Sequence, residues 1–389
     1  MGILALVFLS ILAYTYILYP IILYLLTINK QLSINTDITK DFPITVIIPA
    51  HNEEEVIREK IEDTCYLIQG FKDKLIWVIS DGSSDKTVQI AEEQGLTYPY
   101  LKVHAFEDRG GKTRSINWGV EHSLDGLIMF TDANVLLKES RIDKAIALFN
   151  DERIGCVCGE KRAINYRLTN TGKGISLYAR WELKVKDMES SLDSVVGADG
   201  GLFIIRKELF SPLPLDVIDD FATSLNIRTM GYWVVLSRDL IGIEPAAIDK
   251  REEFRSKVRV ISRAWKGFLH VPSVLSFFKH PLFTWEFISH KILRWLSPFF
   301  LLGLFLFIPA AIGNKIYIPF MLGFLLYLCL SMLGWIFEGF NLRFLPFAVP
   351  YYFSLVNLAA LLGLFRFLRG GSNITWQRSQ SARYKGKDE

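Results

Sequence analysis

Long apolar segments alternate with mixed, charge-rich segments along the chain. Four segments carry no charged side chain, namely residues 2–28, 296–313, 316–337 and 344–365. A helix needs about 20 predominantly apolar residues to cross a bilayer, so each segment can span it, the second only just. Buried core helices would also be apolar, but three such segments close together near the C-terminus favour a membrane. The pattern predicts one N-terminal and about three C-terminal transmembrane helices.

The first apolar segment could instead be a cleaved signal peptide. It has no basic residues before its apolar run, and that run is longer than the roughly 7–15 residues of a signal peptide. No small-residue cleavage site follows it. We therefore interpret residues 1–30 as a permanent anchor.

Residues 41–267 mix charges with short apolar runs. Four runs are rich in branched residues, which is typical of strands buried on both faces: residues 44–50, 75–80, 101–106 and 126–131. The polar stretches between them have helical spacing and helix-capping signals. This alternation predicts an α/β domain with a mostly parallel, Rossmann-like sheet covered by helices.

Polar side chains follow each predicted strand, where parallel sheets bind their ligands. The second strand leads into SDGSSDKT, in which Asp81 lies at the strand end and Gly82 permits a tight turn. The fourth leads into TDAN, in which Asp132 and Asn134 could together hold a hard divalent cation. Each stretch also has a plainer interpretation, namely a turn or an aspartate that caps the next helix.

Two further stretches carry candidate chemistry. In DRGGKTRSINWG, Lys112 follows two glycines, which can bring backbone and positive charge to a phosphate, although the Walker A spacing is not matched. Asp219 and Asp220 begin a predicted helix, and paired carboxylates can raise one another's pKa, which suits a general base. Asp219 could equally be a helix cap with no other role.

Composition narrows the class of protein. The net charge of +3 is small and no basic stripe with interleaved aromatic residues is present, so nucleic acid is not an expected partner. The four cysteines follow neither the spacing of a zinc site nor that of a disulfide framework. Reduced thiols facing the cytosol are the simplest interpretation.

The order of these motifs resembles that of the family 2 glycosyltransferases, which have a GT-A fold. Six stretches occur in the family's order: VIIPAHNEE, SDGSSD, RGGK, TDAN, GADGGLFIIRKELF and DDFATSLNIRTMGYWVV. With apolar segments on both sides, the chain is similar to the membrane-embedded branch that includes the synthases of cellulose, hyaluronan, chitin oligosaccharides and poly-N-acetylglucosamine. The resemblance implies a UDP-sugar donor and does not specify the sugar.

The resemblance also implies roles for individual residues. The strand ends that contact the nucleoside match Ala50, His51 and Glu53 on the first strand and Asp81 on the second. The lysine that reaches the diphosphate matches Lys112.

The metal and the base are implied in the same way. Asp132 and Asn134 match the D-x-D position, with asparagine for the second aspartate, so Mg²⁺ or Mn²⁺ is the expected cofactor. Asp220 matches the catalytic base, with Asp219 as its neighbour.

The stretch SKVRV, residues 256–260, matches the place of the Q-x-x-R-W motif of processive synthases but keeps only Arg259, which we expect at the donor diphosphate. The predicted reaction is inverting transfer of a hexosyl or N-acetylhexosaminyl group from a UDP-sugar to a growing glycan or a lipid-linked acceptor, in exopolysaccharide or cell-surface glycan synthesis. The missing glutamine and tryptophan leave open a single-addition transferase acting on a lipid-linked acceptor.

Two other classes fit less well. A transporter would need a charged residue inside an apolar segment, and none is there. A nucleotide-binding regulator could use the same fold but would not need a base at Asp220.

The predicted organisation has five parts: an anchor (1–30), a catalytic domain (41–267), interfacial helices in contact with membrane lipid (268–295), a C-terminal transmembrane region (296–368) and a basic tail (369–389). We expect the plasma membrane, with the catalytic domain facing the cytosol, where nucleotide sugars are made. Short basic tails tend to stay inside, so one late apolar segment is expected to be re-entrant or interfacial.

Overall fold

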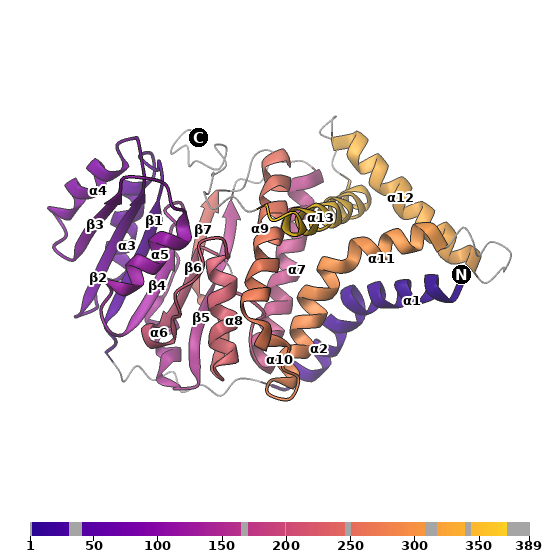
Figure 1. Ribbon diagram of the computed structural model, residues 1–389, viewed down its shortest axis with the longest axis horizontal. Helices are drawn as coiled ribbons and strands as arrows, with labels where there is room; N and C mark the ends of the chain where they lie inside the picture. Colours follow the sequence, from indigo (N-terminus) through magenta and orange to yellow (C-terminus); the bar gives the residue numbers. More distant parts are fainter. Residues whose placement is uncertain are drawn as a thin grey trace.

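The computed structural model describes most of the chain: residues 2–30, 41–164, 170–198, 200–245, 250–307, 317–338 and 344–371. A sheet with its covering helices forms one end of the molecule, and long apolar helices form the other (Figure 1). The predicted tail lies outside the described residues from 372 onward.

A seven-stranded sheet forms the centre of the region predicted to be the catalytic domain, in the order β3-β2-β1-β4-β6-β5-β7. β1 to β4 are parallel, β6 runs antiparallel to both of its neighbours, and β5 is parallel to β7. The strands are Ile44–Ala50, Lys74–Asp81, Leu101–Phe106, Leu127–Thr131, Ile154–Ile164, Leu202–Arg206 and Trp233–Pro245 for β1 to β7. The mostly parallel α/β sheet and the four strands predicted for it are therefore confirmed.

Helices cover both faces of this sheet, because its central strands are apolar on both sides. In β1, Val46 and Ile48 pack into one core with residues of α3, α4 and α6, whereas Ile47 packs into a second core with α5 and α8. These helices are α3 (Ile57–Leu67), α4 (Thr87–Gly95), α5 (Lys112–Glu121), α6 (Ile142–Ala147) and α8 (Asp219–Thr229). The continuous apolar runs of the sequence thus correspond to fully buried strands.

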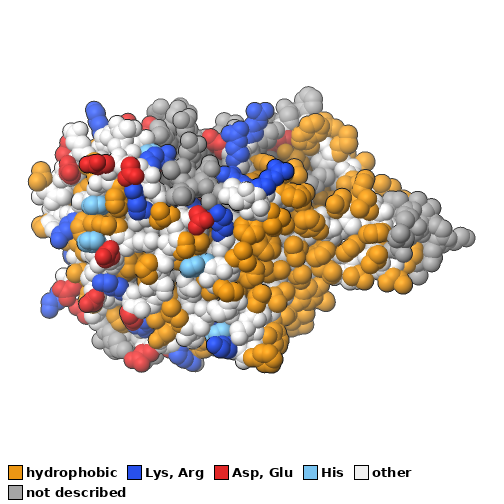
Figure 2. All heavy atoms as spheres, viewed as in Figure 1, with side chains coloured by type: hydrophobic (Ala, Val, Ile, Leu, Met, Phe, Trp, Pro, Cys, Tyr) orange, Lys and Arg blue, Asp and Glu red, His pale blue; other side chains and the backbone are white. Residues whose placement is uncertain are grey.

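Two long helices, α7 (Asn170–Leu192) and α9 (Lys250–His270), lie between the sheet and the apolar helices (Figure 1). Among the described residues, four helices are long and apolar enough to cross a membrane: Gly2–Thr27, Pro281–Phe307, Ile318–Glu338 and Leu345–Leu368. The first of these comprises α1 (Gly2–Ala13), a π-helical turn (Tyr14–Leu18) and α2 (Tyr19–Thr27). The second comprises α10 (Pro281–Phe287), a π-helical turn (Ile288–Ile292) and α11 (Leu293–Phe307). The third and fourth are α12 and α13. Hydrophobic side chains dominate the visible surface over this part, whereas charged ones are scattered over the sheet region (Figure 2).

The second apolar helix begins at Pro281, inside the stretch that we expected to lie at the membrane interface. Its polar residues interrupt the apolar pattern of the sequence, but they face a buried charge cluster. The His290 ring contacts Glu182 at 2.8 Å, and Arg294 pairs with the same carboxylate at 2.6 Å. Because these side chains have partners on α7, the helix continues through them.

Tyrosines of the first helix tie it to the same region. The Tyr19 hydroxyl donates to Glu189 of α7 at 2.7 Å. The Tyr14 hydroxyl lies 2.7 Å from the Ser289 hydroxyl, and Tyr16 lies 3.0 Å from Ser297. The anchor helix is thus held to the second apolar helix by hydrogen bonds as well as by apolar packing.

We predict that Glu182→Ala lowers the stability of the whole molecule. Burial alone would raise the pKa of Glu182, but the positive charges of His290, Lys291 and Arg294 hold it well below its ordinary value. Removing one member of a buried pair leaves an uncompensated charge, which costs about 3–5 kcal/mol. The melting temperature of the detergent-solubilised protein should therefore fall clearly.

The exposed Glu92→Ala on α4 is the matched control and should leave the melting temperature unchanged. Because the pKa of Glu182 is depressed on folding, its contribution is present above the ordinary glutamate pKa of about 4.3 and is lost as the pH falls below it. Equal melting temperatures for the two variants would contradict the prediction.

Candidate functional site

The carboxyl ends of β1, β2 and β4 meet at one edge of the sheet, because these strands are parallel neighbours. Ala50 ends β1, Asp81 ends β2, and Asp132 follows β4 directly. The antiparallel β6 begins at the same edge, and the N–H of Asp132 donates to the carbonyl of Gly201 at 3.2 Å. The residues predicted from separate motifs are therefore brought together.

Asp81 holds the loop that precedes α5. Its carboxylate accepts hydrogen bonds from the N–H groups of Gly110 and Gly111, both at 2.8 Å, and from Arg114, also at 2.8 Å. Asp81 is only 5% exposed. The Arg114 guanidinium in turn stacks over the Phe106 ring, 4.1 Å from its centroid. Asp81 thus has a positioning role that its sequence context did not indicate.

The loop after β1 is fastened to the loop after β2. The His51 ring contacts the carbonyl of Asp81 through Nδ1 at 2.8 Å. The side chain of Asn52, whose φ of 54° is left-handed, accepts from the N–H of Ser84 at 2.8 Å. Glu53 is buried, and its N–H donates to the Thr87 hydroxyl at 2.7 Å. These contacts fix the two expected nucleoside-binding loops relative to each other.

Lys112 connects the two carboxylate groups of the site. Its Nζ lies 2.9 Å from Oδ1 of Asp132 and 3.1 Å from Oδ2 of Asp219. Burial alone would lower the pKa of Lys112, but the negative charges of Asp132, Asp219 and Asp220 raise it above its ordinary value. The lysine therefore remains an ammonium group at the first turn of α5, facing the first turn of α8.

Two consecutive glycines leave room for the carboxylates. A Cβ atom at Gly200 would collide with the carboxylate of Asp220, and one at Gly201 would lie 2.6 Å from Oδ2 of Asp132. Gly201 also has a φ of +109°, which disfavours other residues. The stretch GADGG signalled this segment, but sequence reasoning gave its glycines no role.

α9 brings two arginines to the same edge. Arg263 is 8% exposed and donates to the Thr113 hydroxyl at 3.2 Å, beside Lys112. Burial lowers the pKa of Arg259, the nearby Arg263 lowers it further, and the negative charge of Asp132 opposes both effects. Arg259 is thus electrostatically coupled to the predicted metal carboxylate.

At the predicted metal site, Asp132 and Asn134 supply only some of the ligands that a metal ion needs. These residues lie in a turn closed by the N–H of Val135, which donates to the Asp132 carbonyl at 3.1 Å. Within the described ranges, no group of three or more His, Cys, Asp and Glu side chains could hold a metal. The oxygens of Asp132 and Asn134 suit a hard cation that takes its remaining ligands from a diphosphate and water.

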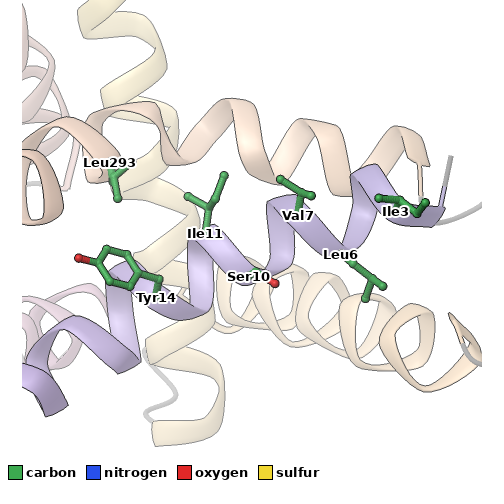
Figure 3. A pocket seen from close by; sticks show the side chains of 7 residues that line it. All are labelled: Ile3, Leu6, Val7, Ser10, Ile11, Tyr14 and Leu293. Atoms are coloured by element: carbon green, nitrogen blue, oxygen red, sulfur yellow. The ribbon is translucent and has the colours of Figure 1, made fainter.

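A separate apolar groove of about 410 Å³ lies at the other end of the molecule, along α1 (Figure 3). Its lining consists of Ile3, Leu6, Val7, Ser10, Ile11, Tyr14 and Leu293. None of the predicted donor-site residues lines this groove.

Comparison with known sequences points to a single family. Residues 45–213 match the sequence model of Glycosyl transferase family 2. The chain is 36% identical over 132 residues to the probable glycosyltransferase YdaM of Bacillus subtilis, covering 32% of this chain and 31% of that protein. It is 26% identical over 171 residues to the β-monoglucosyldiacylglycerol synthase of Trichormus variabilis, covering 43% and 36%. It is 28% identical over 140 residues to the poly-β-1,6-N-acetyl-D-glucosamine synthase of Staphylococcus aureus, covering 36% and 33%.

These matches span about a third of the length of each curated relative. Among solved structures, the mannosyltransferase PcManGT from Pyrobaculum calidifontis, in complex with GDP-Man and Mn²⁺, superposes with a TM-score of 0.71. It is 19% identical, and the match covers 94% of this chain and 99% of that one, so the two share a fold that includes the apolar helices. The resemblance to family 2 and the GT-A fold are both confirmed: residues 45–213 form a domain that matches glycosyltransferase family 2.

Proposed function

We propose that the protein is a membrane-bound, inverting glycosyltransferase that moves a sugar from a nucleoside diphosphate donor to an acceptor hydroxyl. The observation that carries the proposal is the position of Lys112, whose ammonium lies between Asp132 and Asp219 where the parallel strands end. This arrangement places positive charge, a candidate metal carboxylate and a candidate base within one small volume. Sugar transfer needs all three at the anomeric carbon and its leaving group.

The donor would lie across the carboxyl ends of β1, β2 and β4. The loops around His51 and Asp81 would hold the nucleoside, with Ala50 and Glu53 behind them. Lys112 and Arg259 would contact the diphosphate and stabilise its negative charge as the anomeric bond breaks. A divalent cation held by Asp132 and Asn134 would add positive charge at the leaving diphosphate.

Asp220 would act as the general base. It follows Asp219 in the first turn of α8, its Oδ1 accepts a hydrogen bond from the N–H of Phe221 at 2.7 Å, and its carboxylate lies against Gly200. Asp219, whose Oδ2 lies 3.1 Å from Nζ of Lys112, would position the lysine, while Asp220 would take the proton of the acceptor hydroxyl. Direct attack of the acceptor hydroxyl on the anomeric carbon, with Asp220 as its base, would displace the diphosphate and invert the anomeric configuration.

The acceptor is proposed to be a growing glycan or a lipid-linked molecule. The relatives named above include a glycolipid synthase and a polysaccharide synthase, which represent both possibilities. The incomplete Q-x-x-R-W motif around Arg259 favours a short product or a single addition. Product length, measured by mass spectrometry after incubation with candidate donors, would decide between them.

The donor nucleoside and the orientation are also proposals. We propose a UDP-sugar as the donor on the basis of Asp81. Because PcManGT was solved with GDP-Man, GDP-sugars should be tested beside UDP-sugars as donors. The catalytic domain would face the cytosol, in the plasma membrane, since nucleotide sugars are made in the cytosol.

Donor binding should depend on a divalent cation. UDP should bind more weakly when a chelator replaces Mg²⁺ or Mn²⁺ in a calorimetric titration, because Asp132 and Asn134 supply only part of the donor set. In Asp132→Asn, the difference between metal and chelator should largely disappear. Equal UDP affinity in the wild type with metal and with chelator would disprove the metal assignment.

Asp220→Asn should lower the rate of transfer by about 10²–10⁴, because a general base contributes that much. Its affinity for UDP should stay close to that of the wild type, since the base acts on the acceptor. Asp81→Ala should instead weaken donor binding, because it removes a nucleoside contact and releases the Gly110–Gly111 loop. Full activity of Asp220→Asn, together with an inactive Asp219→Asn, would move the base to Asp219.

Gly201→Ala should reduce transfer by about 10–100-fold, because the added methyl group would displace the Asp132 carboxylate and small misplacements of reacting groups are costly. Gly70→Ala is the control, since a Cβ there meets nothing within 4 Å. Both variants should be compared by transfer rate and by melting temperature. If Gly201→Ala keeps the wild-type rate, Asp132 does not need this close backbone contact.

A further inference from the structure

α13 is oriented differently from the other apolar helices. Figure 1 shows α1 and α11 extending side by side away from the sheet, whereas α13 is turned out of their direction. In the close-up, α13, the pale yellow helix, runs across α1 and α11 rather than along them (Figure 3). A helix that crossed the bilayer with α1 and α11 would be expected to run roughly along them.

α1, α11 and the start of α12 pack together in a bundle, whereas the second half of α12 packs against the first half of α13, where the Phe337 and Phe347 rings lie 5.3 Å apart. A Cβ on Gly2 of α1 would collide with Tyr317, which precedes α12. The Phe8 ring of α1 packs 6.0 Å from the Phe307 ring at the end of α11. The start of α1, the end of α11 and the start of α12 therefore lie together, at the end of the bundle away from the sheet.

Both halves of α13 contact helices of the catalytic region. In the first half, the Tyr352 ring lies 6.0 Å from the Tyr178 ring of α7. In the second half, a Cβ on Gly363 would lie 2.9 Å from Cβ of Ile261 on α9. The Phe367 ring then stacks 6.2 Å from Trp265 of α9. A spanning helix would move away from these helices along its length, whereas α13 stays against them from its second turn to its last.

The outward side of α13 is apolar, and its end is basic. Leu358, Leu362, Phe365 and Leu368 are 41–66% exposed. Arg366 is close enough to Arg259 of the candidate site to lower its pKa, although burial and Arg263 lower it more. The helix thus has an apolar outer side, an inner side against the catalytic helices, and a basic end beside the donor site.

We propose that α13 does not cross the bilayer but lies along its surface on the side of the catalytic domain, with lipid against the outward side. The chain then crosses the membrane three times, through the helices that contain α1, α11 and α12. The chain leaves α13 at Arg369 on the same side as the catalytic domain, which agrees with the retention of short basic segments on the cytosolic side. The expected interfacial segment is thereby assigned to residues Leu345–Leu368.

Spin labels on single cysteines would measure the depth of α13 in the bilayer. Labels at Val349, Leu358 and Leu368 sample α13 over a separation of 19 positions, or roughly 28 Å of helix at 1.5 Å per residue. A surface helix should place all three within about 5–10 Å of the headgroup boundary. A spanning helix would place Leu358 near the bilayer centre and the other two near opposite surfaces, which would overturn the proposal.

Leu322, Leu326 and Met332 of α12 provide the matched control, since these exposed positions should show the depth profile of a spanning helix. All variants should carry Cys329→Ser, because Cys329 is exposed, whereas Cys65, Cys156 and Cys158 are buried.

Labelling with a membrane-impermeant maleimide gives an independent test in native membrane vesicles. Arg369→Cys should react in the same vesicle preparations as Glu121→Cys on the catalytic domain. Lys315→Cys, between α11 and α12, should react only when the vesicles are opened or oppositely oriented. If Arg369→Cys behaves like Lys315→Cys, α13 crosses the membrane and the proposal is wrong.

Discussion

The ion pairs of Lys112 with Asp132 and Asp219 are the interaction on which the candidate site depends. Two unit charges 4 Å apart interact by about 4 kcal/mol at an effective dielectric constant of 20, which is comparable with the whole stability of a small domain. Three carboxylates so close together would repel one another strongly without a cation between them. The lysine offsets this repulsion, so the carboxylates can be buried. Because Lys112 begins α5 and Asp219 begins α8, the same ion pair joins these two helices.

The surrounding backbone is arranged around these charges. Asp81 binds the loop that leads into Lys112, and Gly201 lets the β6 strand pass close to Asp132. Arg263 links α9 to α5 through Thr113, next to the lysine. α9, which lies between the sheet and the apolar helices (Figure 1), is therefore connected directly to the residues expected to bind the donor.

Much of this arrangement could be predicted from the sequence, because its causes are local. The apolar runs define buried strands, and parallel strands bring Asp81 and Asp132 to one edge. The remainder depends on contacts between residues far apart in the chain. Asp81 accepts hydrogen bonds from Gly110 and Gly111, about thirty positions away, and no local pattern reports this. Similarly, the polar residues before residue 296 interrupt the apolar pattern of the sequence. Only the structure shows that His290 and Arg294 pair with Glu182, more than a hundred positions earlier in the chain.

The hydrogen bonds of the anchor helix also bear on how the chain is made. Tyr14 and Ser289 are 275 positions apart, and Tyr16 and Ser297 are 281 apart. At about 5–20 residues per second, a ribosome needs roughly 15–60 s to synthesise the intervening chain. In the proposed membrane-bound protein, the first helix would reside in the bilayer during that time without these hydrogen-bond partners for its tyrosines, while the catalytic domain is synthesised. These hydrogen bonds can form only after the second apolar helix has been synthesised, so in the proposed membrane-bound protein the catalytic domain would be tethered by the first helix before the other apolar helices exist.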